Sequence, residues 1–301
     1  MTTIGKLLLQ YREHQGWTQQ RFAEKLSAYA PVFKNLNSVT VSRWETGTTE
    51  PGLAKKKALL HYFADSECMH RIGKCHEIVR NAYDECLLDP LTSLFNRNYR
   101  YIIGNFPEFN IDQSHLHTLS HFGNRREHFE HIVDIERATN VEGYYNLTPQ
   151  RLEKLCSHPS TFAIIYERKR QHLGHFIMFK IKQDVAEEIV HHTRKEYTVT
   201  TEDLCQPTEK GTYYIHAMYG KNPRIAALVN IQAYLHLFEH FKWTDNVLIF
   251  ASREDGPKLT RHYGIEQIDE GYDDFFGFRW YGYMSPIKKI LFSDIVVREV
   301  F

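Results

Sequence analysis

The spacing of apolar residues changes along this chain, and the change limits how the chain can fold. Near the N-terminus, Ile4, Leu7, Leu8 and Tyr11 recur at the three- and four-residue spacing of an amphipathic helix. From Phe129 onward, alternating and continuous apolar runs that are typical of strands dominate. With a length of 301 residues, this change predicts more than one domain: an all-α first part and a mixed α/β second part.

The sequence also limits where the protein works. No segment approaches the roughly 20 consecutive apolar residues that span a bilayer, and the first residues lack the layout of a signal peptide. The five cysteines are odd in number and include no Cys-x-x-Cys pair, which favours reduced thiols over a disulfide framework. We therefore expect a cytoplasmic protein with no membrane partner.

Charge is balanced overall but not along the chain. The sequence holds 37 basic and 37 acidic residues, yet residues 1–63 carry nine Lys and Arg against four Asp and Glu. An excess of positive charge confined to the first module is expected of a DNA-binding head that carries a different function behind it.

Three helices are expected in this head. The first ends at Gly16, and the second begins after Thr18, whose hydroxyl can cap it. The third begins near 37–38, where Asn or Ser supplies the cap, and it ends at Gly47 with Pro51 shortly beyond.

These helices carry a family resemblance over residues 4 to 63. The matching residues are Thr18, Gln19, Ala23, Leu26, Val41, Ser42, Arg43, Trp44, Glu45, Gly47 and Pro51. They resemble the helix-turn-helix of the Cro/repressor (XRE) family, although the connection 27–37 is longer than the family's tight turn. The resemblance implies that the third helix enters the major groove of double-stranded DNA, in a homodimer that reads two half-sites. The residues it places against DNA are Gln19, Ser38, Val39, Thr40, Ser42, Arg43, Thr48, Thr49 and Lys55, with Arg43 reading a base and Gln19, Thr48, Thr49 and Lys55 beside phosphates.

Residues 66–126 are expected to form a helical linker that could serve as the dimer contact. The stretch from Asp89 to Arg97 is similar to the opening of GGDEF diguanylate cyclase domains, but no Gly-Gly-Asp-Glu-Phe motif follows. We interpret it as the start of a helix, with Asp89 as the cap and Pro90 in the first turn.

The linker also contains the only cluster of metal-ligating residue types, which is Cys68, His70, Cys75 and His76. Because Cys75 and His76 are adjacent, they would point to different faces of a helix, unlike the paired ligands of a structural zinc site. No metal site is predicted.

Residues 127–301 are expected to form an α+β domain around one mixed sheet. The expected strands are 129–135, 161–166, 175–181, 212–219, 246–251 and aromatic strands from Glu266 to the C-terminus. The expected helices are 148–156, 223–241 and a short one from Pro257.

The order and spacing of these elements resemble the GNAT acyltransferase fold across residues 127 to 295. In that family, the loop before the long helix holds the pyrophosphate of acyl-CoA, which implies a site at Met218, Lys221, Asn222, Arg224 and Ala226. Arg224 stands where the family has a glycine, so a side chain occupies the place of close backbone approach. Residues 259–265 look like the family's Leu-Tyr-x-x-x-Gly-Phe, with Thr260 in place of the tyrosine that often acts as general acid.

These departures lead to two hypotheses. The leading one is a sequence-specific DNA-binding transcriptional regulator, with domains 1–65, 66–126 and 127–301, whose GNAT-like domain senses acyl-CoA or another small-molecule effector without catalysis. The alternative is an active N-acyltransferase that uses acyl-CoA and is targeted by its head, for which Glu167, His216 and Glu254 are candidate bases. A head used for pairing with another protein is a third option.

Overall fold

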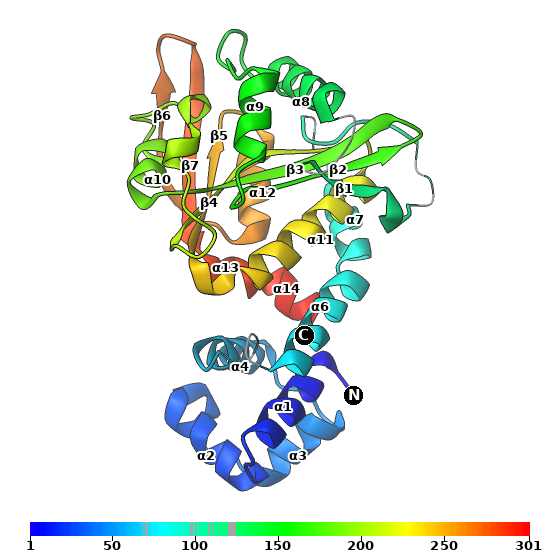
Figure 1. The fold of residues 1–301 in the computed structure, drawn as a ribbon. Helices are drawn as coiled ribbons and strands as arrows, with labels where there is room; N and C mark the ends of the chain where they lie inside the picture. The colour runs from blue at the N-terminus through cyan, green and yellow to red at the C-terminus, as the bar shows by residue number, and fades with distance from the viewer. Residues whose placement is uncertain are drawn as a thin grey trace. The chain divides into compact units, whose positions relative to one another are not determined.

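The described part of the chain forms two compact units. The computed structural model describes residues 1–301 except 68, 70, 71, 97, 98, 100, 108, 110 and 120–124. One unit combines Met1–Leu87 with Leu291–Phe301, and the other is Leu88–Ile290 (Figure 1). The second unit is therefore inserted between two parts of the first. This division differs from the expected boundaries at residues 65 and 126.

The first unit is helical. Its helices are α1 (Thr3–His14), α2 (Gln19–Tyr29), the short 3-10 helix η1 (Pro31–Phe33), α3 (Ser38–Thr46), α4 (Leu53–Asp65), α6 (Gly73–Cys86) and α14 (Asp294–Glu299). The three helices expected from the first part of the sequence are present. The assignment of α2 and α3 to a DNA-binding helix-turn-helix stays a prediction.

The helix ends in the head follow the local sequence. The hydroxyl of Thr18 accepts a hydrogen bond from Arg21 N at 3.2 Å, and Asn37 Oδ1 accepts one from Thr40 N at 2.9 Å. Of the two expected caps for α3, Asn37 is the one used. Gly47 ends α3 with a φ of 76°, a left-handed conformation that glycine adopts at little cost.

The last residues of the chain belong to the head. Val296 and Val297 on α14 are fully buried, and α14 packs on α4, where Asp294 pairs with Lys57. Tyr83 on α6 donates a hydrogen bond to Leu291 O at 2.9 Å. The expectation of aromatic strands up to the C-terminus is therefore wrong beyond residue 286, because the apolar residues that follow are buried as helix.

The second unit is a mixed sheet with helices. Its strands are β1 (Leu116–Thr118), β2 (Phe162–Arg168), β3 (Gln171–Ile181), β4 (Gly211–Gly220), β5 (Thr244–Ala251), β6 (Gln267–Asp273) and β7 (Phe278–Pro286). Its α-helices are α7 (Leu88–Phe95), α8 (Arg125–Thr139), α9 (Pro149–Cys156), α10 (Gln183–Val190), α11 (Pro223–Glu239), α12 (Asp255–Tyr263) and α13 (Ile287–Leu291). Short 3-10 helices lie at Gln113–His115, Glu196–Thr198, Thr201–Asp203 and Phe241–Trp243.

The seven strands follow the order β1-β2-β3-β4-β5-β7-β6. Strands β4 and β5 pair in parallel, and the other described pairs are antiparallel. The parallel pair requires a crossover, and α11 provides it. The mixed sheet expected from the sequence is confirmed.

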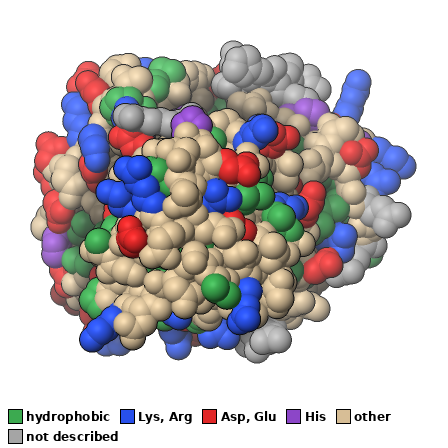
Figure 2. Space-filling model, turned by 90° about the horizontal axis from the view of Figure 1, so that it is seen from below, with side chains coloured by type: hydrophobic (Ala, Val, Ile, Leu, Met, Phe, Trp, Pro, Cys, Tyr) green, Lys and Arg blue, Asp and Glu red, His purple; other side chains and the backbone are tan. Residues whose placement is uncertain are grey.

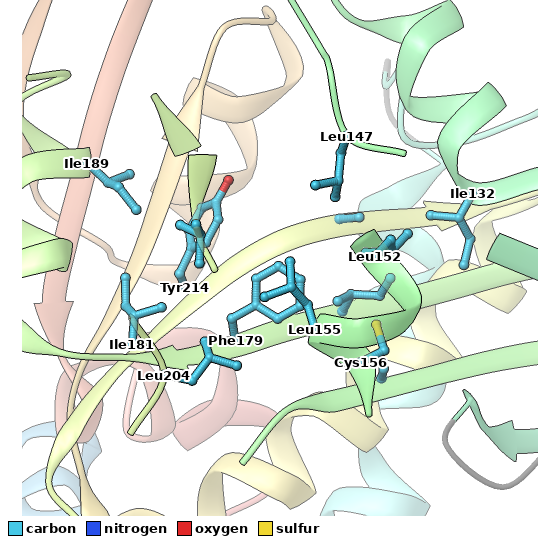
Figure 3. Packing of buried hydrophobic residues seen from close by; sticks show 14 of the residues in the cluster. Ile132, Leu147, Leu152, Leu155, Cys156, Phe179, Ile181, Ile189, Leu204 and Tyr214 are labelled. Atoms are coloured by element: carbon cyan, nitrogen blue, oxygen red, sulfur yellow. The ribbon is translucent and has the colours of Figure 1, made fainter. Parts of the chain in front are cut away.

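The two faces of the sheet are covered by different helices. On one face, α8, α9 and α10 pack over β2, β3 and β4, where Leu155, Phe179 and Tyr214 are buried in one cluster (Figure 3). On the other face, α11 packs on β2, β3 and β4 and also on α7. Because helices cover both faces, β3 is buried at every residue after Gln171.

One expected strand is a helix. Residues 129–135 lie within α8, where Phe129, Ile132, Val133 and Glu136 are buried and face the sheet. Their three- and four-residue spacing is helical, but the β-branched residues in the run favoured a strand. This correction matters because α8 supplies the side chains of the candidate site.

Among the helices of the described residues, none is both long enough and apolar enough to cross a membrane.

Candidate active site

A pocket opens where strands β4 and β5 part. Their parallel register runs from Gly211 opposite Thr244 to Ile215 opposite Ile249, and the two strands are not paired beyond this point. The pocket lies at this fork and encloses about 710 Å³, including space open to solvent. We call it the fork pocket; its lining is Ile102, Glu136, Asn140, Tyr145, Glu196, Tyr214, Ile215, His216, Ala217, Met218, Ile249, Phe250, Ala251, Ser252, Arg253, Asp255, Gly256 and Leu259.

A buried carboxylate projects into the fork pocket from α8. Glu136 is 2% exposed; its Oε2 lies 3.7 Å from Arg253 Nη2 and accepts a hydrogen bond from Asn140 Nδ2 at 3.2 Å. Burial alone would raise the pKa of Glu136, but the positive charge of Arg253 acts in the opposite direction and the pKa lies below its usual value. Glu136 is therefore an anion at neutral pH, placed to attract a cationic group such as an ammonium.

A histidine on β4 faces the same pocket. His216 Nε2 lies 3.0 Å from the Tyr145 hydroxyl, while its Nδ1 is inaccessible to solvent and has no hydrogen-bond partner. Burial lowers the pKa of His216 to about 4, so the ring is neutral at pH 7. An unsatisfied polar atom in a polar pocket is uncommon, and a ligand atom is one way to satisfy it.

A second carboxylic acid lies in the pocket wall. Burial raises the pKa of Glu196 to about 7, although a hydrogen bond from the Tyr144 hydroxyl acts in the opposite direction. Glu196 and Glu136 thus differ in charge state near neutrality. Two carboxylic acids whose pKa values differ are a common arrangement for proton transfer.

Most residues of the predicted acyl-CoA loop lie outside the lining of the fork pocket. Met218 lines the pocket, whereas Lys221, Asn222, Arg224 and Ala226 do not. Asn222 caps α11 by accepting from Ile225 N at 2.9 Å. The two cations of the loop also have partners within the chain, because Lys221 Nζ lies over the ring of Phe106 at 5.7 Å and Arg224 Nη1 lies 3.7 Å from Asp89 Oδ1.

The backbone amides of this loop are occupied too. Gly220 N donates to Ile102 O at 3.0 Å, and Lys221 N donates to Leu173 O at 2.7 Å. Gly104 N in turn donates to Gly220 O at 2.8 Å, so residues 102–104 pair with the outer end of β4. The amides of Gly220 and Lys221 are therefore used within the chain, and the pyrophosphate-binding role of the loop stays a prediction.

The remaining candidate catalytic residues are dispersed. Glu167 is at the end of β2, and Glu254 precedes α12; neither lines the fork pocket. Thr260 is fully buried and donates to Gly256 O at 3.0 Å, which satisfies its hydroxyl within the helix. Of the three expected bases, only His216 is in the pocket.

In the head, α3 presents the residues expected to read DNA. Val39 is 56% exposed and Arg43 is exposed, while Val41 and Trp44 anchor the helix in the core. Ser38, Thr40 and Ser42 are half-buried on the same helix. The face seen from below in Figure 1 carries basic, acidic and hydrophobic side chains interspersed (Figure 2).

The expected phosphate-contacting residues differ in their surroundings. Gln19 Nε2 donates to Glu45 Oε2 at 2.8 Å, and Arg12 Nε donates to Glu45 Oε1 at 2.5 Å. Lys55 Nζ lies 5.7 Å from the centre of the Trp44 ring. Thr48 and Thr49 are exposed. The side chain of Gln19 is therefore committed to holding α2 against α3.

Two of the four residues in the linker's cluster of metal-ligating residue types are not among those that the structure describes. Cys68 and His70 lie outside the described residues. Within the described ranges, no group of three or more His, Cys, Asp or Glu side chains is arranged to hold a metal ion.

Comparisons with known proteins show similarity to acyltransferases of known structure. No protein-family model matches the chain, and no curated protein matches it. FeeM, an N-acyl amino acid synthase from uncultured soil microbes, is 11% identical with a TM-score of 0.38 over 55% of this chain and 86% of its own. An N-acetyltransferase from Staphylococcus aureus Mu50 is 6% identical with a TM-score of 0.37, over 57% and 96%. An aminoglycoside 6'-N-acetyltransferase complexed with coenzyme A is 8% identical with a TM-score of 0.34, over 53% and 90%.

Sequence reasoning missed most of the fork pocket. The expected strand 129–135 ends before Glu136, and no motif marks Tyr145, Arg253 or Glu196, which begins a short 3-10 helix. The helical spacing of Phe129, Ile132, Val133 and Glu136 was the one signal available, since a carboxylate on an apolar helical face indicates a buried acid.

Proposed function

We propose that the second unit transfers an acyl group from a thioester to an amine in the fork pocket. The observation that carries the proposal is the unpartnered Nδ1 of His216 beside the ionised Glu136, in a pocket at the fork of a parallel strand pair. A pocket with convergent polar groups of perturbed pKa is the expected form of an active site. The likeness of the chain to acyltransferase structures is consistent with this reaction class.

The residues of the pocket can serve each part of this reaction. Glu136 attracts the amine, and Arg253 keeps the carboxylate ionised and in place. The bound ammonium first loses one proton to solvent, and the neutral amine nitrogen then attacks the thioester carbonyl. A C–N bond forms, the C–S bond breaks, and the sulfur leaves as a thiolate that is then protonated. His216 Nδ1, when Tyr145 donates to Nε2, carries the hydrogen and can donate it to the carbonyl oxygen as negative charge develops there. The proton lost by the amine passes to Glu136.

The residues that carry the proposal surround the reacting groups, and Lys221, Asn222, Arg224 and Ala226 lie outside the fork pocket, so the proposal does not depend on coenzyme A as the carrier. The donor class proposed is an acyl thioester recognised at its reacting end. This distinguishes the proposal from a sensor domain that binds acyl-CoA through its nucleotide.

Amide formation and ligand binding, the latter measured by calorimetry, test the assignment. Purified protein is given acetyl-CoA or the nucleotide-free thioester S-acetyl-N-acetylcysteamine, with a panel of primary amines, and amide formation is followed by mass spectrometry. Glu136→Gln is expected to lower kcat/KM by about 100-fold or more, as for loss of a positioned proton acceptor. Glu142→Gln, an exposed acid of the same unit, is the matched control. Binding without turnover would favour the ligand-sensing alternative, and neither binding nor turnover would reject both.

For the head, we propose sequence-specific binding of double-stranded DNA by a homodimer. The specific observation is the exposed face of α3, where Val39 and Arg43 project while Trp44 and Val41 fix the helix. Two such helices in a dimer would read half-sites about 34 Å apart. Selection of bound sequences from a random DNA pool tests this function, and recovery of a twofold-symmetric site is the expected result. A regulator of this kind could take the thioester or the amide product as its effector.

A further inference from the structure

Three histidines in the second unit form a continuous buried chain. His128 on α8 and His172 and His175 on β3 are at most 4% exposed. His128 Nδ1 lies 3.1 Å from His172 Nδ1, and His172 Nε2 lies 2.9 Å from His175 Nδ1. At the outer end, His128 Nε2 lies 3.1 Å from Glu167 Oε2; at the inner end, His175 Nε2 lies 3.9 Å from Glu136 Oε1.

We infer that this chain moves protons between Glu136 in the fork pocket and Glu167 at its partly exposed outer end. The inference rests on the proposed function, since Glu136 is the group that receives the proton of the amine. It adds three positioning residues that do not touch the substrate and that no motif indicated.

The hydrogen bonds restrict the chain to two orders of protonation. A neutral imidazole has one N–H and one lone pair, so each ring that donates on one side must accept on the other. If His128 Nε2 donates to Glu167, then His172 Nδ1 donates to His128, His175 Nδ1 donates to His172, and His175 Nε2 is left with a lone pair facing Glu136. In the opposite order, His175 Nε2 donates to Glu136 and His128 Nε2 turns a lone pair toward Glu167.

The distances identify the resting order. The separation of 3.1 Å at Glu167 is a hydrogen bond, whereas the 3.9 Å at Glu136 is not, and His175 Nε2 has no hydrogen-bond partner. The resting chain therefore points its N–H groups outward and offers its free lone pair to the pocket. Burial, reinforced by His175, His128, His131 and Lys221, lowers the pKa of His172 well below its usual value, which keeps the resting chain uncharged.

The transfer conserves protons at every step. A proton on Glu136 passes to His175 Nε2 once a small movement closes the 3.9 Å gap. His175 Nδ1 then releases its proton to His172 Nε2. In the same way, His172 Nδ1 releases its proton to His128 Nδ1. His128 Nε2 then delivers a proton to Glu167, which loses it to solvent. One proton leaves the pocket, one reaches water, and the three rings end in the opposite order. The reverse sequence, which takes a proton from water at Glu167, restores the resting order and returns one proton to the pocket, where it protonates the departing thiolate.

The order of protonation can be observed directly. In full-length protein labelled with ring ¹⁵N histidine, wild type is expected to show protonated Nε2 in His128 and protonated Nδ1 in His172 and His175. Glu167→Gln removes the charge at the outer end and supplies an amide donor, so all three rings are expected to invert together. His262→Gln, at an exposed histidine on α12, should leave all three unchanged. Inversion of His128 alone, or of none, would overturn the relay.

Kinetics supply the second measurement. His172→Gln is expected to lower kcat by on the order of 10- to 100-fold with little change in KM, and to alter the solvent deuterium isotope effect, while His262→Gln stays within about twofold. Cooperative inversion in a protein that forms no amide would keep the relay and reject acyl transfer. Amide formation that is insensitive to His172→Gln would keep acyl transfer and reject the relay.

Discussion

Replacing Glu196 by glutamine should change how the stability of the second unit depends on pH. Burial raises the pKa of Glu196 from 4.5 to about 7 in the folded protein. Each pKa unit corresponds to about 1.4 kcal/mol, so ionising this buried acid costs about 3 kcal/mol relative to the unfolded chain. Below pH 4.5 the acid is protonated in both states and the cost is absent. As the pH rises through 7, wild type loses up to about 3 kcal/mol of unfolding free energy from this group.

Glutamine cannot ionise but can still accept from the Tyr144 hydroxyl. The difference in unfolding free energy between Glu196→Gln and wild type should therefore shift by about 3 kcal/mol in favour of the variant between pH 4 and pH 8. Urea denaturation, followed by amide protection in β3 and β4, reports on the second unit. Glu202→Gln, an exposed acid nearby, is the control and should show no such shift. A difference that does not vary across this pH range would refute the buried-acid argument.

Three further predictions concern the head and the sheet. Arg43→Ala should relax sequence preference by about 1–3 kcal/mol at one base pair, whereas Lys55→Ala should weaken all sites alike and reduce the salt slope, both measured by fluorescence anisotropy. Asn37→Ala removes the cap of α3 and should destabilise the head by about 1 kcal/mol in urea denaturation, with Asn37→Asp near wild type. Gly282→Ala would place a Cβ 1.9 Å from Val190 O and should lower the melting temperature of the second unit in calorimetry; an unchanged transition would contradict this packing.

The helices of the head could be predicted because their signals are local. Thr18 and Asn37 cap their helices through side chains three residues from the amides they bind, and Gly47 permits a left-handed turn by lacking a Cβ. Because these signals are local, the sequence placed the end of the first domain at residue 65 and did not include the C-terminal helix. That α14 returns to pack on α4 depends on contacts more than two hundred residues apart, for which no local pattern exists.

The strands of the second unit were also largely predictable, and the helix α8 was not. A buried run such as β3 shows its apolar residues directly, but Phe129 to Ile135 mixes apolar residues at helical spacing with β-branched side chains. The strand propensity of the β-branched residues and the helical spacing of the apolar residues indicated different secondary structures. The segment forms a helix because this conformation places the buried residues on one face, which packs over the sheet.

The candidate site shows the same limit. His216 was among the expected bases, but the fold gives it a surrounding that the sequence did not show, with Glu136 from α8 and Tyr145 and Arg253 from two connections. The loop 221–226 was expected to bind pyrophosphate, and the fold places residues 102–104 beside Gly220, directly before this loop. Neither outcome follows from spacing, since each depends on which distant segment occupies a given edge.

The order of residues by itself determined the local structure: where helices start and stop, which runs are buried strands, and that a helical module precedes a mixed sheet. Short-range hydrogen bonds and side-chain periodicity act within a few residues, so they can be recognised in the amino-acid sequence. Only the tertiary structure decided which polar groups share a pocket, which pKa values move and how three histidines connect. Those properties depend on desolvation and on distances between segments that are far apart in the chain.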